Sequence, residues 1–503
     1  MTRHSLTDAF DQQGEWWLPE APSRRLSGRI TVRADKYAEL NLLDSFQPIE
    51  GVVQIADHIE YPIVLGTTAN GEAVTLLNCQ QMGRGFRFGS GGLRTPERLL
   101  SSWVLIGAHA GPGAPCSSVR FRVPGLSSWL GEKLIDEGWT EPGGALREGS
   151  RRREITYRVR WAGGIDVRSD AMPGLIKIET EVGRQQDTYT ALAVHVSGWV
   201  LIESNEPQPL TWFIERFHCL SALFAILAGT PMSPDCICAR ADGSNEGISV
   251  LVAFQDTKLC EYRRPDQFFL SYPLLGTDFG HLLDRWFEVY SRAGLPCQLA
   301  LSAVHSDGPW NHVRFVSILQ ALEGLHRGWF HGAYLPESEY DAVKKVLAAA
   351  IPASLQKSHR ESLAARIKYG NQYSLRKRLN ELANLLSDDI RRILFGGQGG
   401  VPGQWVDTRN YYTHWDETDR PQALDAEGMF HATVRMREVF RTVLLTLLEV
   451  PAMILAEALN GQSETIEELR QLNVIERRRR DPNDQSGILM TVTKEEAPND
   501  SSG

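Results

Sequence analysis

The chain contains 503 residues, of which 42% are hydrophobic and 23% are charged, a composition typical of a globular protein. Its length exceeds what one hydrophobic core usually organises, so two or three domains are expected. The net charge of −9 argues against a surface that is positive all over, and any binding of nucleic acid must come from local basic patches.

The first residues, MTRHSLTDAFDQQGEWW, contain no apolar stretch of the kind found in a signal peptide. We expect residues 1–20 to be a flexible N-terminus. The seven cysteines are odd in number and widely scattered, which indicates reduced thiols and a cytoplasmic location. Cys236 and Cys238 are one residue apart, which fits alternating strand positions better than a zinc site. No metal, no other cofactor and no membrane partner are predicted.

The next part of the sequence has patterns that are typical of β-strands. Short β-branched or alternating runs such as GRITVRA, SVRFRV, ITYRVRW and ISVLVAF extend from about Gly28 to about Phe254. Turn residues separate these runs, which predicts a β-rich region over residues 21–300, a sandwich or barrel with inserted helices. One buried helix is expected at Pro209 to Gly229, where apolar residues face most sides and a glycine ends the run.

From about Asn311 onward the patterns are helical. The first helix has one apolar stripe at helical spacing, formed by Val313, Val316, Leu319, Leu322 and Leu325. The apolar segment from Val443 to Leu459 contains two glutamates and Pro451. We expect it to be a core helix that bends or restarts at the proline rather than a membrane span.

The expected fold class is therefore α+β and multidomain. The β-rich N-terminal region with inserted helices is followed by an all-α bundle over residues 301–462. The end of the chain, residues 477–503, begins with a basic run and is otherwise polar, and we expect it to be disordered.

The segment DTRNYYTHWDE, Asp407 to Glu417, follows a glycine-rich run and gathers acidic, basic and amide groups. Arg409 and His414 enclose four residues, the spacing R-x4-H, and Asn410 follows the arginine directly. An imidazole can take the proton of a ribose 2′-hydroxyl or give one to a leaving 5′-oxygen. A guanidinium can hold the scissile phosphate and offset its growing charge. The amide of Asn410 can orient either group.

This set of side chains suits RNA cleavage without a metal, which leaves a 2′,3′-cyclic phosphate and a 5′-hydroxyl end. The spacing alone is weak evidence, because arginine is abundant in this chain. The alternative is the polar start of a helix, with Asp407 or Thr408 as the N-cap residue.

The context of the motif resembles the HEPN family of ribonucleases, whose members carry R-x4-6-H with a polar residue, often Asn, after the arginine. RFVSILQALEGLHR (Arg314 to Arg327), KYGNQYSLRKRLNEL (Lys368 to Leu382) and RNYYTHWD follow one another in an order that resembles the HEPN domain of the ApeA family. Those bacterial proteins join a large β-rich N-terminal region to a HEPN domain and act in defence against phage.

The resemblance implies that Arg409, Asn410 and His414 are catalytic residues of an endoribonuclease whose site forms in a homodimer of HEPN domains. One helix carries too few groups for both acid and base catalysis, so a dimer is also expected on chemical grounds. The implied partners are an RNA substrate, often tRNA in such systems, and an unknown phage-derived trigger sensed by the N-terminal region.

A local basic stretch is the candidate site for RNA phosphates. Its members closest to the motif in sequence are Lys368, Arg376, Lys377 and Arg378. A solvated helix face explains the same residues equally well.

Three further residues are candidates to support the site. Glu323 and His326 share one face of the helix that starts near Arg314, and the alternative for them is a surface pair. Asp416 closely follows His414 and is a candidate to orient its imidazole.

Two functions are compatible with these patterns. The leading hypothesis is a metal-independent endoribonuclease in anti-phage defence, controlled by the N-terminal region. The alternative is a binding protein, in which a non-catalytic HEPN domain is a dimerisation or scaffold module and the β-rich region recognises a glycan or a phage protein. Burial of His414 in the core of one chain would favour the alternative, whereas the nuclease requires a cleft shared by two copies.

Overall fold

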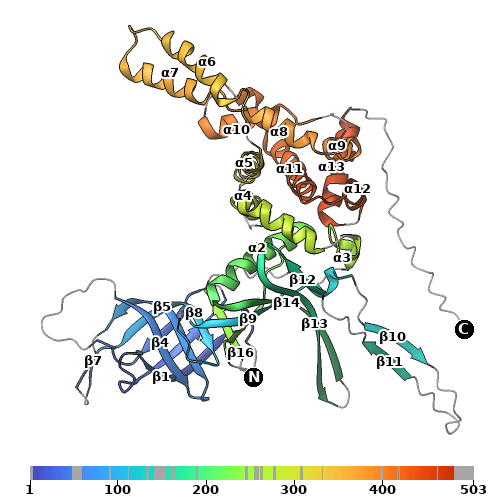
Figure 1. Cartoon of the computed structure of the whole chain (residues 1–503). Helices are drawn as coiled ribbons and strands as arrows, with labels where there is room; N and C mark the ends of the chain where they lie inside the picture. Colours follow the sequence, from blue (N-terminus) through green and yellow to red (C-terminus); the bar gives the residue numbers. More distant parts are fainter. Residues whose placement is uncertain are drawn as a thin grey trace, which may run out of the picture. The chain divides into compact units, whose positions relative to one another are not determined.

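The computed structural model divides the chain into two units (Figure 1). The first comprises Met1–Asp307 and Leu444–Ile454, and the second comprises Gly308–Val443 and Leu455–Gly503. The structure describes residues 4–480 except 35, 48–58, 86, 90–91, 112, 132–134, 141–153, 160–164, 189–190, 244–246, 254–259, 261–263, 276–278, 306–309, 331, 397–399, 416, 419 and 462.

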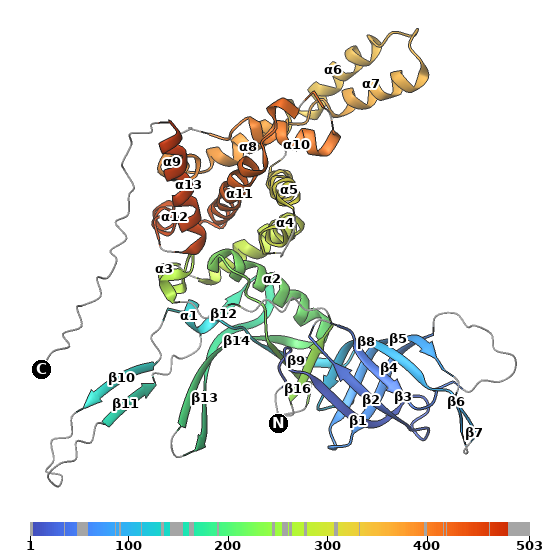
Figure 2. The same ribbon diagram turned by 180° about the vertical axis from the view of Figure 1, so that it is seen from behind.

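The first unit is built on an antiparallel sheet of 12 strands in the order β12-β13-β14-β9-β15-β16-β8-β3-β2-β1-β4-β5. Part of this sheet closes into a barrel, because β5 pairs with β8 as well as with β4 (Figures 1 and 2). Closure pairs backbone groups that an open sheet edge would leave free. The barrel strands are β1 (Phe10–Trp17), β2 (Leu26–Val32), β3 (Ala38–Leu42), β4 (Glu60–Thr68), β5 (Ala73–Arg84) and β8 (Glu97–Ile106).

Strand β8 joins the barrel to the rest of the sheet. Its first half pairs with β3 and its second half with β16, while β5 lies along its other edge. The remaining strands of the sheet are β9 (Pro115–Arg122), β12 (Ile165–Ser169), β13 (Met172–Thr188), β14 (Ala191–Pro209), β15 (Cys236–Ala241) and β16 (Gly247–Val252). Two small hairpins are formed by β6 (Arg87–Gly89) with β7 (Gly92–Arg94) and by β10 (Ile135–Thr140) with β11 (Glu154–Val159).

The prediction of a flexible N-terminus over residues 1–20 is wrong for β1, which lies between β2 and β4 in the barrel. Trp16 is fully buried there and lies opposite Leu26 and Gly66 of the neighbouring strands. The sequence FDQQGEWW hides this strand because its apolar residues stand only at its ends. Pairing on both edges orders the polar middle.

Helix α2 (Leu210–Ala228) is the buried helix expected from the sequence. Phe217 stacks on Phe121 of β9 with ring centroids 3.9 Å apart. By length and composition α2 could cross a membrane, but 67% of its apolar window is buried inside the protein, as in the core helix of a globular unit. The other helices of this unit are α1 (Leu126–Trp129), the 3-10 helix η1 (Pro265–Gln267), α3 (Tyr272–Leu275) and α4 (Phe279–His305).

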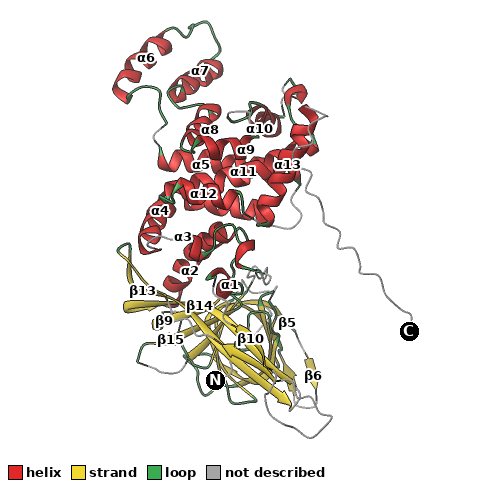
Figure 3. Ribbon diagram, turned by 90° about the vertical axis from the view of Figure 1, so that its right-hand side faces the viewer, coloured by secondary structure: helices red, strands yellow, loops and turns green. Residues whose placement is uncertain are grey.

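The described residues of the second unit form helices and the loops between them, with one isolated β-bridge between Ala333 and Gln372 (Figure 3). The helices from residue 311 onward are α5 (Asn311–Trp329), α6 (Glu337–Ala349), α7 (Lys357–Tyr369), α8 (Leu375–Asn384), α9 (Asp388–Phe395), α10 (Gln404–His414), the 3-10 helix η2 (Arg420–Gln422), α11 (Ala426–Leu447), α12 (Ala452–Leu459) and α13 (Glu464–Arg480). The end of α11 from Leu444 and the start of α12 up to Ile454 belong to the first unit. Helices α6 and α7 form a hairpin that extends from the others (Figures 1 and 2) and contains no buried residue.

The end of the helical unit partly follows the sequence predictions. Helix α11 ends at Leu447 and α12 begins at Ala452, so the apolar segment does restart at Pro451. The expected disorder from residue 477 is wrong for the basic run, because α13 continues through Arg480 and arginine is a good helix former. Residues 481–503 lie outside the described residues. The predicted domain boundary after residue 300 falls inside α4, which belongs to the first unit.

Packing in the barrel predicts the effect of a substitution at Gly66. A Cβ atom at this position would lie 2.2 Å from the ring of Trp16, whose burial leaves the indole little room to shift. We expect Gly66→Ala to lower the free energy of unfolding by about 1–3 kcal/mol, the usual cost of overpacking, as measured by denaturant unfolding. Gly83→Ala is the control, because a Cβ atom at Gly83 meets nothing within 4 Å. Equal effects of the two substitutions would contradict this packing argument.

Candidate active site

Helix α10 carries the R-x4-H motif and is fixed to the helical unit by its buried face. Trp405 is buried and its ring lies 6.2 Å from that of Phe395 on α9. The fully buried Thr408 hydroxyl donates to the Gln404 carbonyl at 2.6 Å and accepts from the Leu424 backbone N–H at 2.9 Å. These contacts set the rotation of α10 about its own axis.

The position of Thr408 also corrects one of the alternatives drawn from the sequence. Helix α10 begins at Gln404, so neither Asp407 nor Thr408 is its N-cap residue. Thr408 lies inside the helix, where its hydroxyl bonds to the carbonyl four residues earlier, a common way to satisfy a threonine in a helix. The glycines and proline before α10 hid this earlier start.

The structure brings Arg409 together with Asn410 and Glu323. The Arg409 Nη1 atom donates to Asn410 Oδ1 at 3.4 Å, and its Nη2 atom lies 3.7 Å from Glu323 Oε2 on α5. Glu323 also accepts from Arg327 at 2.8 Å. This carboxylate therefore lies between two guanidinium groups, and it holds that of Arg409 in a half-buried position at the helix surface.

His414 lies in the last turn of α10 and its side chain is exposed. The binding alternative would be favoured by burial of His414 in the core of the chain, and His414 is not buried there. An α-helix turns about 100° per residue, so residues five apart leave the helix axis about 140° from each other. Arg409 and His414 of one chain therefore face different directions, whereas Asn410, four residues before the histidine, is on its side of the helix.

His326 and Arg378 are structural residues, contrary to the sequence predictions. His326 is fully buried, its Nε2 atom bonds to Glu381 at 2.8 Å and its Nδ1 atom to Arg378 at 3.0 Å. Because a guanidinium only donates, Nδ1 accepts and Nε2 carries the proton. Arg378 is 1% exposed and also donates to the carbonyls of Tyr373 and Gly332. It is therefore not available to RNA, and both ring nitrogens of His326 bond to Glu381 and Arg378 rather than to a residue of the motif.

The remaining basic candidates are all on or near the surface. Lys368 is exposed on α7 and lies 5.4 Å from the ring of Tyr369. Lys377 pairs with Glu381 at 3.4 Å. Arg376 is exposed on α8 and approaches the start of α10, since a Cβ atom on Gly403 would be 2.0 Å from its Nη2 atom. Among these candidates, Arg376 is thus the one that the structure places next to the helix of the motif.

Asp416, the candidate to orient the imidazole of His414, lies outside the described residues.

An aromatic cluster surrounds the end of α10 and was missed by the sequence analysis. His312 of α5 stacks on Tyr412 with ring centroids 5.2 Å apart and planes 7° from parallel. Trp415 follows with its ring 6.1 Å from Tyr411 and 6.0 Å from Tyr412. The partner from α5 is distant in sequence, and no local pattern indicates it.

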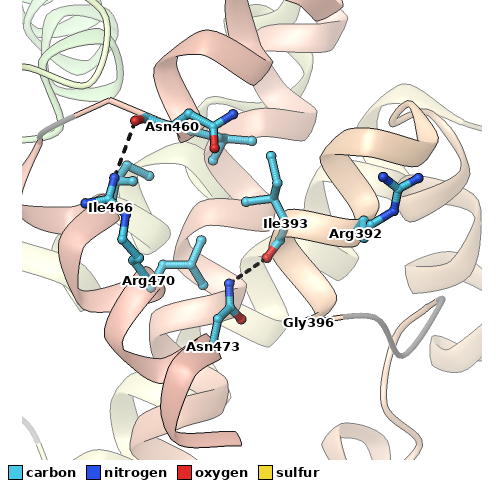
Figure 4. Close-up of a pocket in the computed structure, with 9 residues that line it drawn as sticks. Arg392, Ile393, Gly396, Asn460, Ile466, Arg470 and Asn473 are labelled. Atoms are coloured by element: carbon cyan, nitrogen blue, oxygen red, sulfur yellow. Dashed lines mark hydrogen bonds between the residues drawn. The ribbon is translucent and has the colours of Figure 1, made fainter. Parts of the chain in front are cut away.

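A cavity of about 430 Å³ opens between α9, α12 and α13 (Figure 4). On its wall Asn473 donates to the Ile393 carbonyl at 3.0 Å. Arg470 bonds to Glu467 at 2.5 Å and Arg392 lies 3.2 Å from Asp389. The charges of both arginines are thus offset within the protein, and the cavity contains none of the residues of the R-x4-H motif.

Comparison with protein families identifies both parts of the chain. The model of ApeA N-terminal domain 1 matches residues 12–286, and the model of the Apea-like HEPN domain matches residues 316–453. The chain belongs to the ApeA family. ApeA proteins are HEPN-type nucleases of anti-phage defence, and Arg409, Asn410 and His414 lie inside the matched HEPN segment. No curated protein and no solved structure matched the chain.

The buried His326 predicts how acid affects the stability of this ApeA protein. Burial lowers the pKa of His326 below its ordinary 6.5, although the bond to Glu381 opposes the shift. The unfolded chain then binds more protons than the folded one at acid pH. The stabilisation by neutral His326 is fully present above pH 6.5 and is lost as the pH falls from there toward the folded-state pKa.

We therefore expect the midpoint of thermal unfolding to fall more between pH 7.5 and pH 5.5 in the parent than in His326→Gln. The glutamine amide can still donate to Glu381 but does not titrate in this range. His359→Gln, which changes an exposed histidine of α7, should behave as the parent does. Parallel pH profiles for all three proteins would refute the role assigned to His326.

Proposed function

We propose that this ApeA protein is an endoribonuclease that cleaves RNA without a metal ion, with Arg409, Asn410 and His414 as its catalytic residues. The observation that carries the proposal is the pairing on one helix of an exposed imidazole with a guanidinium that is held at the surface by Glu323 and Asn410. The exposed imidazole and the half-buried guanidinium both lie at the helix surface, where a large substrate can reach them, and the carboxylate limits the directions in which the guanidinium can point.

The reaction we propose is an internal transfer at phosphorus. The 2′-oxygen of the ribose attacks the adjacent phosphorus while an imidazole accepts the 2′-hydroxyl proton. The bond from phosphorus to the 5′-oxygen breaks, and an imidazolium gives its proton to that oxygen. Arg409 offsets the negative charge that gathers on the phosphate oxygens. The products are a 2′,3′-cyclic phosphate and a 5′-hydroxyl end, with no net gain or loss of protons.

The geometry of α10 supports a homodimer as the active form. The acid and the base cannot be one imidazole at one instant, and the directions of Arg409 and His414 differ by about 140° in one helix. Two copies of α10 facing each other would place the arginine of one chain near the histidine of the other. In such a pair each imidazole can serve as acid or base.

We further propose that the substrate is a cellular RNA in the cytoplasm, with tRNA as the first candidate, and that the N-terminal region controls cleavage in response to a phage-derived trigger. These proposals rest on membership of the ApeA family. Among the remaining basic candidates, Arg376 is the one we propose to contact RNA phosphates, because it is exposed and lies against the start of α10.

The central test compares His414→Ala and Arg409→Ala with the parent protein in cells. We expect each substitution to lower cleavage by at least about a hundredfold, since each removes a group that acts in the transition state. Sequencing of 5′-hydroxyl RNA ends identifies the cut sites, and cleavage by the purified parent should persist in EDTA. His359→Ala and Arg392→Ala are matched controls from the surfaces of α7 and α9. Cleavage by both folded active-site variants would rule the proposal out.

Glu323 provides a separate test of how Arg409 is held. We expect Glu323→Gln to lower the rate by about tenfold to a hundredfold, because a neutral amide holds a guanidinium less firmly. Glu323→Asp should restore part of the loss, and Glu339→Gln on the exposed face of α6 should have no effect. An unchanged rate in a folded Glu323→Gln protein would show that Arg409 does not need this partner.

A further inference from the structure

The residue after His414 has an unusual environment for a large aromatic side chain. Trp415 is 67% exposed, although indole rings usually bury most of their surface. It ends α10 in a left-handed conformation with φ of 54°, and its N–H donates to the Tyr411 carbonyl at 2.7 Å. Glycine is the usual residue in this conformation at a helix end. Neither burial nor helix capping therefore accounts for a tryptophan at this position.

The rings around Trp415 hold it from one side. The planes of Tyr411 and Tyr412 meet that of the indole at 65° and 71°, so they contact it edge to face. Tyr412 is fixed in turn by the nearly parallel ring of His312 on α5. The cluster thus supports the indole from the protein side, while two thirds of its surface remains open to solvent.

We propose that Trp415, supported by Tyr412 and His312, is a stacking platform for one unpaired nucleobase of the RNA, next to the phosphate that is cleaved. The proposal rests on the proposed function and deepens it. A phosphate near Arg409 and a 2′-hydroxyl near His414 bring a base of the same strand close to the end of α10. Aromatic side chains bind such bases through their faces, with little regard to sequence.

The platform sets the class of substrate. Bases inside an RNA duplex are stacked on each other and their faces are not accessible, whereas bases of loops and single strands can turn out. In-line attack by the 2′-oxygen also requires a backbone that can leave duplex geometry. The protein is therefore directed to unpaired nucleotides, and cleavage occurs in loops or single-stranded stretches.

The test uses the full chain and an RNA hairpin whose loop riboses are 2′-O-methylated, so that the 2′-hydroxyl attack is blocked. Each loop position in turn carries 2-aminopurine, whose fluorescence falls when it stacks on an aromatic ring. We expect the parent to quench the probe at one loop position. Trp415→Ala should lose this quenching and bind the hairpin about tenfold more weakly, while Trp415→Phe keeps most of both.

Two controls make the outcome specific. Tyr37→Ala removes a 45% exposed aromatic ring from the first unit and should change neither quenching nor affinity. The same RNA as a full duplex should bind without quenching. Quenching by Trp415→Ala equal to that of the parent would overturn the platform.

Sedimentation of the same proteins separates the platform from a role in assembly. If Trp415→Ala is a monomer where the parent and Trp415→Phe are dimers, the indole contacts a second copy of the chain and the platform is overturned. Cleavage assays separate the platform from the proposed function. If His414→Ala loses cleavage while Trp415→Ala cleaves as fully as the parent, only the platform is overturned. Cleavage by His414→Ala overturns the proposed function itself.

Discussion

A buried guanidinium must find an acceptor for each of its donors, and this constraint organises the helical unit around Arg378. Its side chain reaches His326 on α5 and the carbonyls of Tyr373 and Gly332. Gly332 has a φ of 62°, and a Cβ atom there would lie 2.4 Å from Arg378 Nη1. The arginine thus ties α5 and α8 to the base of the α6–α7 hairpin, and it fixes the helix that carries Glu323.

The candidate site depends on this arrangement indirectly, through the position of Glu323 on α5. Glu323 lies one turn before His326 on α5, and it reaches across to Arg409 on α10. Thr408 and Trp405 fix α10 through its buried residues. The fixed part of the site is therefore its arginine, while the histidine stands at an exposed helix end. Such a division suits a site in which a rigid group binds phosphate and a second copy completes the acid and base set.

The sequence predicted a β-rich part followed by a helical part, and it also pointed to the residues of the motif, because both depend on local patterns. Strand alternation and helical stripes repeat over a few residues, and R-x4-H is contiguous. It failed where a residue's role depends on distant partners. Arg378 and Lys377 are neighbours in one basic stretch, yet only the fold shows that Arg378 is buried against His326 while Lys377 is half-exposed and pairs with Glu381. Strand β1 was missed for the same reason, since its order comes from β2 and β4 on either side.

The return of residues 444–454 to the first unit has a consequence for how this chain can be rearranged. The segment contains the buried Leu445, Leu448 and Val450, and Glu449 bonds to His281 and lies 3.1 Å from Arg285 on α4. The helical unit is therefore not a contiguous piece of sequence that recombination could exchange between proteins. A cut before residue 308 would remove this segment from the β-rich unit and expose its apolar side chains. Exchange of sensing and effector parts would have to preserve this segment together with α4, so the two units are expected to be inherited together.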